Sequence, residues 1–241
     1  MRVLLLAGTA EARELSLTLD QNGVDLVTSL AGATDRPAPQ GGALRRGGFG
    51  GAAGLASFVQ EAGITHMIDA THPFAARMSE NAANAAADQG VALLQVVRPA
   101  WPEKPDWQCV EGLADAVGAL TPASRVFLST GRNSLRYFAE RDDVHFLARV
   151  IDDRPGDFPL ANGDFLIGQP PFSIQEEVAT MRDNQIDTLV SRNSGGSGGI
   201  EKLLAAEALG LRIIMVRRPQ LPNATRVETV ADAVSWIAAN R

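Results

Sequence analysis

The sequence has a single cysteine, Cys109, so no internal disulfide can form. It also lacks a CxxC pattern and any cluster of cysteine and histidine with the spacing of metal ligands. We therefore predict no metal site. The lack of paired thiols is typical of a protein that works in a reducing compartment, and we expect a cytoplasmic location.

Long apolar runs and a basic excess are absent as well. The opening run Val3–Ala7 is short and soon meets charged residues, whereas a secretory signal needs roughly 7 to 15 apolar residues. No stretch approaches the ~20 apolar residues that span a bilayer. The formal net charge of −6 argues against general nucleic-acid binding. We expect neither a membrane nor a nucleic-acid partner. Any anion that the protein binds must be bound by cationic or N–H groups close to it. The oligomeric state stays open.

What the 241 residues do contain is a regular alternation of short apolar runs with segments of helical spacing. In the first hundred residues the expected strands are 3–7, 24–30, 64–70 and 91–97. Helical patterns lie between them. These strands are apolar along their length instead of alternating, which is typical of a parallel sheet with both faces covered.

Residues 99–106 contain three prolines and break both periodicities. We place a domain boundary there, between an N-terminal lobe of residues 1–100 and a C-terminal lobe of residues 107–241. The pattern then restarts, with strands expected at 125–129, 145–150, 165–168, 188–192 and 212–216, and helices at 173–184, 200–209 and 230–239. The predicted fold class is α/β, with two Rossmann-like lobes built on parallel sheets.

The two lobes also share a sequence pattern. Ile64–Pro99 and Ile186–Pro219 each run from a strand through a loop and an alanine-rich helix to a glycine, a second strand and Arg-Pro. Duplicated lobes would explain this echo, and so would the general likeness of any two βαβ units. Because open α/β sheets bind ligands beyond the carboxyl ends of their strands, we expect the ligand cleft to lie between the lobes.

Five loops that precede helices are candidates for anion binding, because free backbone N–H groups and the positive end of the helix dipole would face an anion there. They are Gly8–Arg13, Gly47–Gly51, Asp69–Ala75, Ser129–Arg132 and Asn193–Gly199. Residues 194–199 hold four glycines and two serines. That composition is costly in backbone entropy unless something must approach the backbone closely.

The first of these loops departs from the dinucleotide-binding pattern G-x-G-x-x-G. Ala10 and Arg13 stand where the second and third glycines would be. A simple turn from strand to helix, capped by Thr9, is therefore the alternative to nucleotide binding.

The end of the second strand indicates which nucleotide would bind. An enzyme that uses NAD usually has a carboxylate there to hold the ribose, whereas this chain has Ser29. Three arginines follow, Arg36, Arg45 and Arg46. A dinucleotide bound at this lobe should therefore carry a 2′-phosphate.

Three loops carry side chains suited to proton transfer or to binding an acidic ligand. Asp69 and His72 combine a carboxylate with an imidazole, although His72 before Pro73 is also consistent with a local cap. Arg132, at a helix start, either forks onto a carboxylate or lies on the helix surface. Lys202 is within reach of a carboxylate or phosphate at the glycine-rich loop, and a solvated lysine is the alternative.

Taken together and in this order, the loops resemble the precorrin-6A reductase and cobalt-precorrin-6A reductase family of cobalamin biosynthesis. The most specific strings are Asp-Ala-Thr-His-Pro-Phe-Ala at 69–75 and Arg-Gly-Gly-Phe-Gly-Gly at 46–51. Leu-Ala-Gly-Thr-Ala-Glu-Ala-Arg at 6–13, Thr-Gly-Arg at 130–132, Asn-Ser-Gly-Gly at 193–196, Lys202 and Arg218-Pro219 complete the match. Two positions depart from the pattern: Ala7 replaces a common glycine, and Arg192 replaces a common lysine, which changes the geometry of the contact.

The resemblance implies reduction of one double bond in the precorrin-6A macrocycle, or in its cobalt form, with NADPH as the hydride donor and precorrin-6B as the product. The substrate would be a polycarboxylate tetrapyrrole. We assign cofactor binding to Gly8, Thr9, Glu11, Arg13, Ser29, Thr130, Gly131 and Arg132. We assign substrate binding to Gly47, Gly48, Phe49, Asp69, Thr71, His72, Ser194, Gly195 and Gly196. Lys202 is the candidate catalytic residue near the proton transfer, with Asp69, His72 and water as competitors.

Two other functions fit a two-lobed chain with glycine-rich loops. One is a different nucleotide-dependent enzyme, such as a nucleotide-sugar transferase. The other is a non-catalytic two-lobed protein that binds a small anion. Oxidation of NADPH in proportion to substrate would separate a reductase from both.

Overall fold

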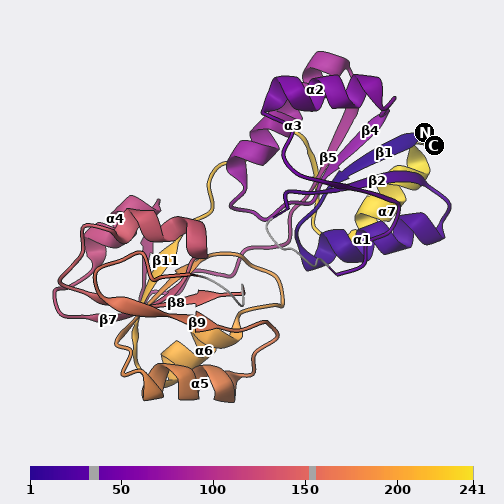
Figure 1. The fold of residues 1–241 in the computed structure, drawn as a ribbon. Helices are drawn as coiled ribbons and strands as arrows, with labels where there is room; N and C mark the ends of the chain where they lie inside the picture. The colour runs from indigo at the N-terminus through magenta and orange to yellow at the C-terminus, as the bar shows by residue number, and fades with distance from the viewer. Residues whose placement is uncertain (33–37, 152–155, 241) are drawn as a thin grey trace. The chain divides into compact units, whose positions relative to one another are not determined.

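The computed structural model describes residues 1–32, 38–151 and 156–240. The chain forms two compact units (Figure 1). Unit 1 comprises Met1–Pro99 together with Gln220–Arg241, and unit 2 comprises Ala100–Pro219. Each unit is built on a six-stranded sheet in which every recorded strand pair is parallel.

Unit 1 has the strand order β12-β5-β4-β1-β2-β3. Its strands are β1 (Arg2–Leu6), β2 (Asp25–Leu30), β3 (Ala43–Arg46), β4 (His66–Asp69), β5 (Ala92–Val96) and β12 (Thr225–Val227). Its helices are α1 (Ala10–Gln21), α2 (Ala52–Glu61), α3 (Ala76–Gln89) and α7 (Val230–Ala239).

Both faces of this sheet are buried under helices. Val3 and Leu5 of β1 pack in one core with residues of α1 and α7, including Leu15 and Ile237. Leu4 and its neighbours on the other face pack in a second core with residues of α2 and α3. Successive side chains of a strand point to opposite faces, so an uninterrupted apolar strand fits between two helical layers.

Unit 2 has the strand order β6-β11-β10-β7-β8-β9. Its strands are β6 (Trp107–Val110), β7 (Arg125–Ser129), β8 (His145–Val150), β9 (Gly163–Ile167), β10 (Thr188–Arg192) and β11 (Arg212–Val216). Its helices are α4 (Leu113–Ala119), the 3₁₀ helix η1 (Arg132–Phe138), α5 (Ile174–Asp183) and α6 (Glu201–Ala208). Phe127, Leu189 and Ile213 form one core with α5 and α6. Phe138 of η1 packs on Phe146, with ring centroids 5.4 Å apart.

The predicted fold class, two Rossmann-like lobes with parallel sheets, is confirmed. The two sheets have the same order once β1–β5 are matched to β7–β11. The sixth strand is exchanged between them: β6 follows β5 in the chain but joins unit 2, and β12 follows β11 but joins unit 1. The cleft between the lobes stays a prediction.

The expected domain bounds need one correction. Residues 107–241 were expected to form one lobe, whereas Gln220–Arg241 belongs to unit 1. The physical reason is that β12 pairs with β5, with Arg226 opposite Gln95, and that Ala233 and Ile237 of α7 complete a core of unit 1. In Figure 1, the yellow α7 accordingly lies beside the indigo α1.

The exchanged segments are also repeats of each other in sequence. Residues 110–117 read Val-Glu-Gly-Leu-Ala-Asp-Ala-Val, and residues 227–234 read Val-Glu-Thr-Val-Ala-Asp-Ala-Val. Asp115 accepts a hydrogen bond from the backbone N of Gly112 at 3.1 Å, and Asp232 contacts Thr229 at the matching position. The shared strand order and this repeat together support duplication as the origin of the two units.

Sequence patterns missed β3, β6, β12 and the helix α4. The three strands are short, and β3 and β12 present mostly exposed or half-buried residues at a sheet edge. An edge strand has neighbours on one side only, so it need not be an apolar run.

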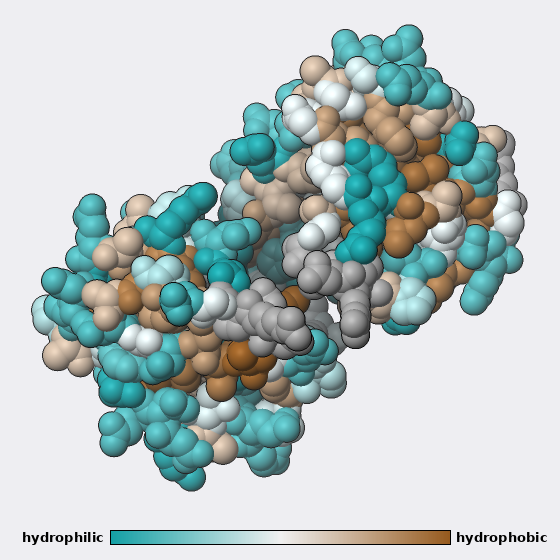
Figure 2. Space-filling model, viewed as in Figure 1, coloured by the Kyte–Doolittle hydropathy of each residue, from teal (hydrophilic) through white to brown (hydrophobic). Residues whose placement is uncertain are grey.

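Apolar side chains form the buried cores, and polar side chains are mostly at the surface. Hydrophilic residues cover most of the visible face of each unit, with apolar residues between them (Figure 2). Among the described residues, no helix combines the length and the apolarity that crossing a membrane requires.

Unit 2 contains a buried ion pair. Arg149 of β8 forms two hydrogen bonds to the carboxylate of Glu177 of α5, at 2.5 and 2.8 Å, and the Glu177 side chain is 2% exposed. The Arg149 guanidinium also lies 4.0 Å from the ring centroid of Phe172. Removing one partner of such a pair leaves a buried charge without its counter-charge.

We expect Glu177→Ala to lower the free energy of unfolding by about 3 to 5 kcal/mol, because the Arg149 guanidinium would stay buried. Urea denaturation of the whole chain measures this. The double variant Arg149→Met/Glu177→Leu removes both charges and should lose less stability than the single variant. A single variant as stable as the parent protein would show that the pair is not structural.

Candidate functional site

In unit 1, three of the predicted site residues and the unpredicted Arg98 lie where the parallel strands end. Thr9 and Glu11 follow β1, Thr71 follows β4, and Arg98 follows β5. With Pro73 and Val96, these four side chains line one small hollow. Their placement at the carboxyl edge of adjacent strands follows from the strand order β5-β4-β1.

Thr9 connects two of the loops. Its side chain caps α1 by accepting a hydrogen bond from the N–H of Ala12 at 3.1 Å. Its hydroxyl also donates to the carbonyl of Ala70, after β4, at 2.9 Å. The capped turn expected as the alternative is therefore present, and nucleotide binding at this loop stays a prediction. The same hydroxyl also links the end of β1 to the end of β4. Gly8 beside it has φ +143°, a conformation that residues with a side chain rarely adopt.

Glu11 is paired with a residue that the sequence patterns did not assign. The Arg98 guanidinium donates to the Glu11 carboxylate at 2.9 Å, and both side chains are partly buried. Glu11 lies in the first turn of α1, where a carboxylate already interacts favourably with the helix dipole. The only sequence signal for Arg98 is that Arg98-Pro99 recurs as Arg218-Pro219.

The loop after β4 is held by its own side chains. Asp69 is buried, and its Oδ1 accepts hydrogen bonds from the N–H and the hydroxyl of Thr71, at 3.1 and 2.6 Å. The Nδ1 of His72 accepts from the N–H of Phe74 at 3.2 Å, which is the local cap considered above. In this structure both side chains organise the loop.

Arg45 organises the loop that follows β3. Its guanidinium donates to the carbonyls of Gly47 and Gly48, at 2.5 and 2.9 Å, and lies 3.7 Å from the ring centroid of Phe49. It also approaches the Ser29 hydroxyl, at 3.4 Å. Partial burial lowers the pKa of Arg45. Arg45 thus joins the predicted cofactor residue Ser29 to the predicted substrate loop.

The other basic residues predicted for this end of unit 1 are more exposed. Arg13 is exposed, and its Nε donates to the carbonyl of Pro39 at 3.0 Å. Arg46 is exposed at the end of β3. Arg36 lies outside the described residues.

In unit 2, the loop after β7 is partly as expected. Thr130 is buried, and its hydroxyl lies 2.6 Å from that of Ser134. Gly131 has φ +84° and Arg132 begins η1, a 3₁₀ helix. The exposed Arg132 guanidinium lies 5.6 Å from the ring centroid of Phe165.

The glycine-rich loop after β10 is held by donors that bind its carbonyl groups. Arg218 donates to the carbonyls of Asn193 and Ser194, at 2.8 and 2.9 Å. The amino group of Lys202 donates to the carbonyl of Gly199. Lys202 therefore supports the backbone of the loop, and its predicted catalytic role stays a prediction.

The carboxyl edge of this sheet also carries a half-buried cation and exposed apolar residues. Arg192 ends β10, and desolvation by burial lowers its pKa. Ile151 directly follows β8 and is 53% exposed, and Ile167 ends β9 and is 50% exposed. Cationic and apolar groups therefore occur at the same edge.

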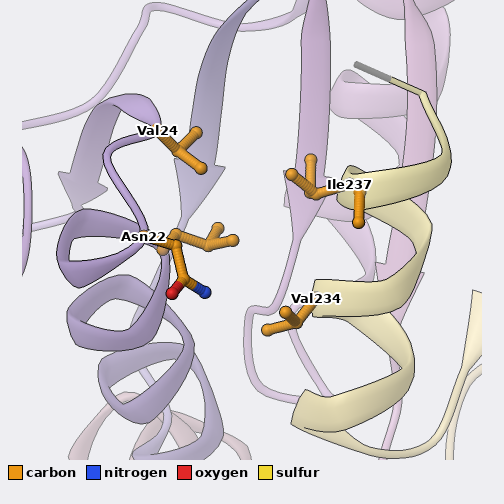
Figure 3. Close-up of a pocket in the computed structure, with 6 residues that line it drawn as sticks. Asn22, Val24, Val234 and Ile237 are labelled. Atoms are coloured by element: carbon orange, nitrogen blue, oxygen red, sulfur yellow. The ribbon is translucent and has the colours of Figure 1, made fainter.

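A second hollow, of about 190 Å³, lies elsewhere, between α1 and α7 (Figure 3). Asn22, Val24, Val234 and Ile237 line it together with Leu19 and Ala238. It adjoins the start of β2, at the amino end of the strands, and Asn22 is its one polar residue. It holds no group suited to proton transfer, so we do not place the site there. Within the part of the chain that the structure describes, no group of three metal-ligating side chains is found.

Comparison with known proteins decides the family. The family model described as "Precorrin-6x reductase CbiJ/CobK" matches residues 2–238. The chain belongs to this family. It is 41% identical over 240 residues to the precorrin-6A reductase of Rhodobacter capsulatus, covering 98% of this chain and 96% of that protein. It is 43% identical over 242 residues to the one from Rhodococcus erythropolis, covering 98% and 97%.

A solved structure described as "CobK precorrin-6A reductase" has the same fold as this family member. The TM-score is 0.92 at 41% sequence identity, with 99% of this chain and 96% of that chain covered. The resemblance inferred from the loops is therefore confirmed. The roles of the individual site residues stay predictions.

We expect Thr9→Val to weaken the site at unit 1, because valine keeps the shape but loses both hydrogen bonds of the hydroxyl. The free energy of unfolding should fall by about 1 kcal/mol, as for other lost N-caps, and the KM for NADPH, the predicted cofactor, should rise severalfold. Thr229→Val is the matched control, because Thr229 caps α7 in the same unit and no ligand role is predicted for it. An identical KM in the two variants would remove Thr9 from the cofactor site.

Proposed function

We propose that this protein is a precorrin-6A reductase of cobalamin biosynthesis, which uses NADPH to reduce one double bond of the precorrin-6A macrocycle to give precorrin-6B. The observation that carries the proposal is the family match over residues 2–238, because that range includes both units and all five candidate loops. The transferase and the anion-binding protein considered above have no comparable support. The single cysteine supports a cytoplasmic location.

Unit 1 has groups that fit a dinucleotide with a 2′-phosphate. The N-terminus of α1 at Thr9 offers backbone N–H groups for a pyrophosphate. Ser29, near the end of β2, stands where an enzyme that uses NAD usually has a carboxylate. Arg45 and Arg46 lie on the neighbouring strand β3. A ribose 2′-phosphate would meet cations here instead of a negative charge. When bound, NADPH supplies the hydride, and the protein must hold it against one face of the macrocycle.

The Arg98–Glu11 pair would keep this end of unit 1 receptive to an anion. A lone Glu11 carboxylate in the first turn of α1 would repel a pyrophosphate at the same helix end. The Arg98 guanidinium, at 2.9 Å, neutralises that charge. We assign Arg98 to the support of cofactor binding through Glu11.

Unit 2 and the loops of unit 1 that follow β3 and β4 would bind the tetrapyrrole. Its ring edge carries carboxylates, which arginines and helix N-termini recognise. Arg132 and Arg192 lie at the carboxyl ends of β7 and β10. Exposed Ile151 and Ile167, at the same edge, offer an apolar surface to the macrocycle.

Reduction of the double bond also needs a proton. Lys202, Asp69 and His72 are the candidate donors in the protein, with water as the fourth. In the structure, each of the three side chains is engaged with its own loop. A donor from this set would have to exchange that contact for one with the substrate, and water would need no such change.

The comparisons favour the metal-free substrate. Relatives called precorrin-6A reductase are 39% to 43% identical to this chain. Those called cobalt-precorrin-6A reductase are 27% to 28% identical. We therefore propose precorrin-6A without cobalt as the natural substrate.

The purified protein should oxidise one NADPH for each precorrin-6A reduced. Turnover with NADH should be at least tenfold less efficient in kcat/KM, because NADH lacks the 2′-phosphate. Cobalt-precorrin-6A, tested in the same absorbance assay, should be the poorer substrate. No oxidation of NADPH with either macrocycle would reject the function, and equal efficiency with both would reject the choice of substrate.

A double-mutant cycle tests the Arg98–Glu11 pair. Arg98→Ala should raise the KM for NADPH about tenfold, which corresponds to one charge-assisted interaction of about 1.4 kcal/mol. Glu11→Gln removes the repulsion, so the double variant Arg98→Ala/Glu11→Gln should regain most of the affinity. Steady-state kinetics at saturating precorrin-6A give these values. A double variant no better than Arg98→Ala would mean that Arg98 does not act by neutralising Glu11.

A further inference from the structure

Trp101 holds the glycine-rich loop of unit 2, although it lies far from that loop in the sequence, in the proline-rich segment 99–106. Its side chain is buried, with 5% of the residue exposed. The indole Nε1 donates to the carbonyl of Gly196 at 2.8 Å. The Trp101 backbone exchanges two hydrogen bonds with the side-chain amide of Asn193, both at 2.9 Å.

These bonds fix the direction of peptide groups in the loop. In a trans peptide, the N–H of one residue points away from the carbonyl of the residue before it. Since Trp101 binds the Gly196 carbonyl, the N–H of Ser197 is turned to the opposite side. Arg218 binds the Ser194 carbonyl and turns the N–H of Gly195 in the same manner.

We propose that Trp101 is a positioning residue for substrate binding. Its indole N–H and its bridge to Asn193 hold residues 193–197 so that backbone N–H groups meet a carboxylate on the rim of the tetrapyrrole. This inference rests on the proposed function and adds to it one residue and one kind of ligand group.

The donors around the loop fit a carboxylate of the substrate. The recorded hydrogen bonds of Lys202 and Arg218 go to carbonyls of the loop, so these cations build its backbone. The Lys202 amino group also lies 5.1 Å from the ring centroid of Trp101. Neutral backbone N–H donors can satisfy a carboxylate, which is the anionic group that the rim of the proposed substrate carries.

The test compares two tryptophan variants of the whole chain. Trp101→Phe removes the N–H donor and keeps an aromatic ring. Trp107→Phe is the matched control, because Trp107 lies in the same unit, is 8% exposed, and donates its indole N–H to Glu207 at 3.0 Å. For each variant we would measure the melting temperature, kcat, and the KM for precorrin-6A and for NADPH.

We expect Trp101→Phe to raise the KM for precorrin-6A about fivefold to tenfold, the value of one hydrogen bond of about 1 to 1.4 kcal/mol. Its kcat and its KM for NADPH should stay within twofold of the parent values. Trp107→Phe should leave both KM values within twofold of the parent values. The two variants should have similar melting temperatures.

Three results would overturn the inference. They are equal KM values for precorrin-6A in the two variants, a rise confined to the KM for NADPH, and a loss of kcat alone. If Trp101→Phe fails to fold, Arg218→Lys serves instead, because lysine keeps the charge but cannot reach two carbonyls as a fork. Arg218→Lys should raise the KM for precorrin-6A, and an unchanged KM would count against the inference. A parent protein that does not reduce precorrin-6A would reject the proposed function itself, which is a distinct result.

Discussion

Each sheet of this protein depends on a sixth, edge strand that directly follows the last central strand of the other sheet in the chain: β6 follows β5, and β12 follows β11. Without β12 the edge of β5 would present unpaired N–H and carbonyl groups, and without β6 the same would hold for β11. The segment that supplies β12 also supplies the helix α7. Ala233 and Ile237 of α7 fill the core over one face of the sheet in unit 1. Unit 2 is thus formed by one continuous segment, Ala100–Pro219, whereas unit 1 needs both Met1–Pro99 and the segment that begins at Gln220.

The same strand order explains why the segments where the chain passes from one unit to the other carry side chains that hold the candidate loops. After β5 the chain passes Arg98 and then Trp101, and after β11 it passes Arg218. Each of these segments follows its strand at the carboxyl edge of the sheet, where the loops of a parallel sheet lie. Arg98 binds Glu11 in unit 1, while Trp101 and Arg218 hold the loop after β10 in unit 2. Segments that look like linkers in the sequence thus hold the candidate loops of each unit.

The sequence was informative where a residue's role is local. Central strands such as β1 and β10 are apolar because both faces are buried, and candidate loops such as Gly8–Arg13 could be placed because they follow those strands. Pairings across long distances left no such trace. Arg98 and Glu11 are 87 residues apart, and Trp101 and Asn193 are 92 apart. The edge strand β12 was missed for the same reason. Its partner lies early in the chain, although the repeated Val-Glu-x-x-Ala-Asp-Ala-Val string was a readable clue.

The late position of β12 has a consequence for the order in which the protein is made. On the ribosome, all six strands of unit 2 have been synthesised once β11 is complete, while unit 1, begun earlier, still lacks an edge strand and a covering helix. The contact between Gln95 and Arg226 spans 131 residues and can form only after Arg226 has been synthesised. The lobe that starts second is thus the first to possess its full sheet, and the nascent N-terminal lobe keeps an open strand edge until β12 has been synthesised.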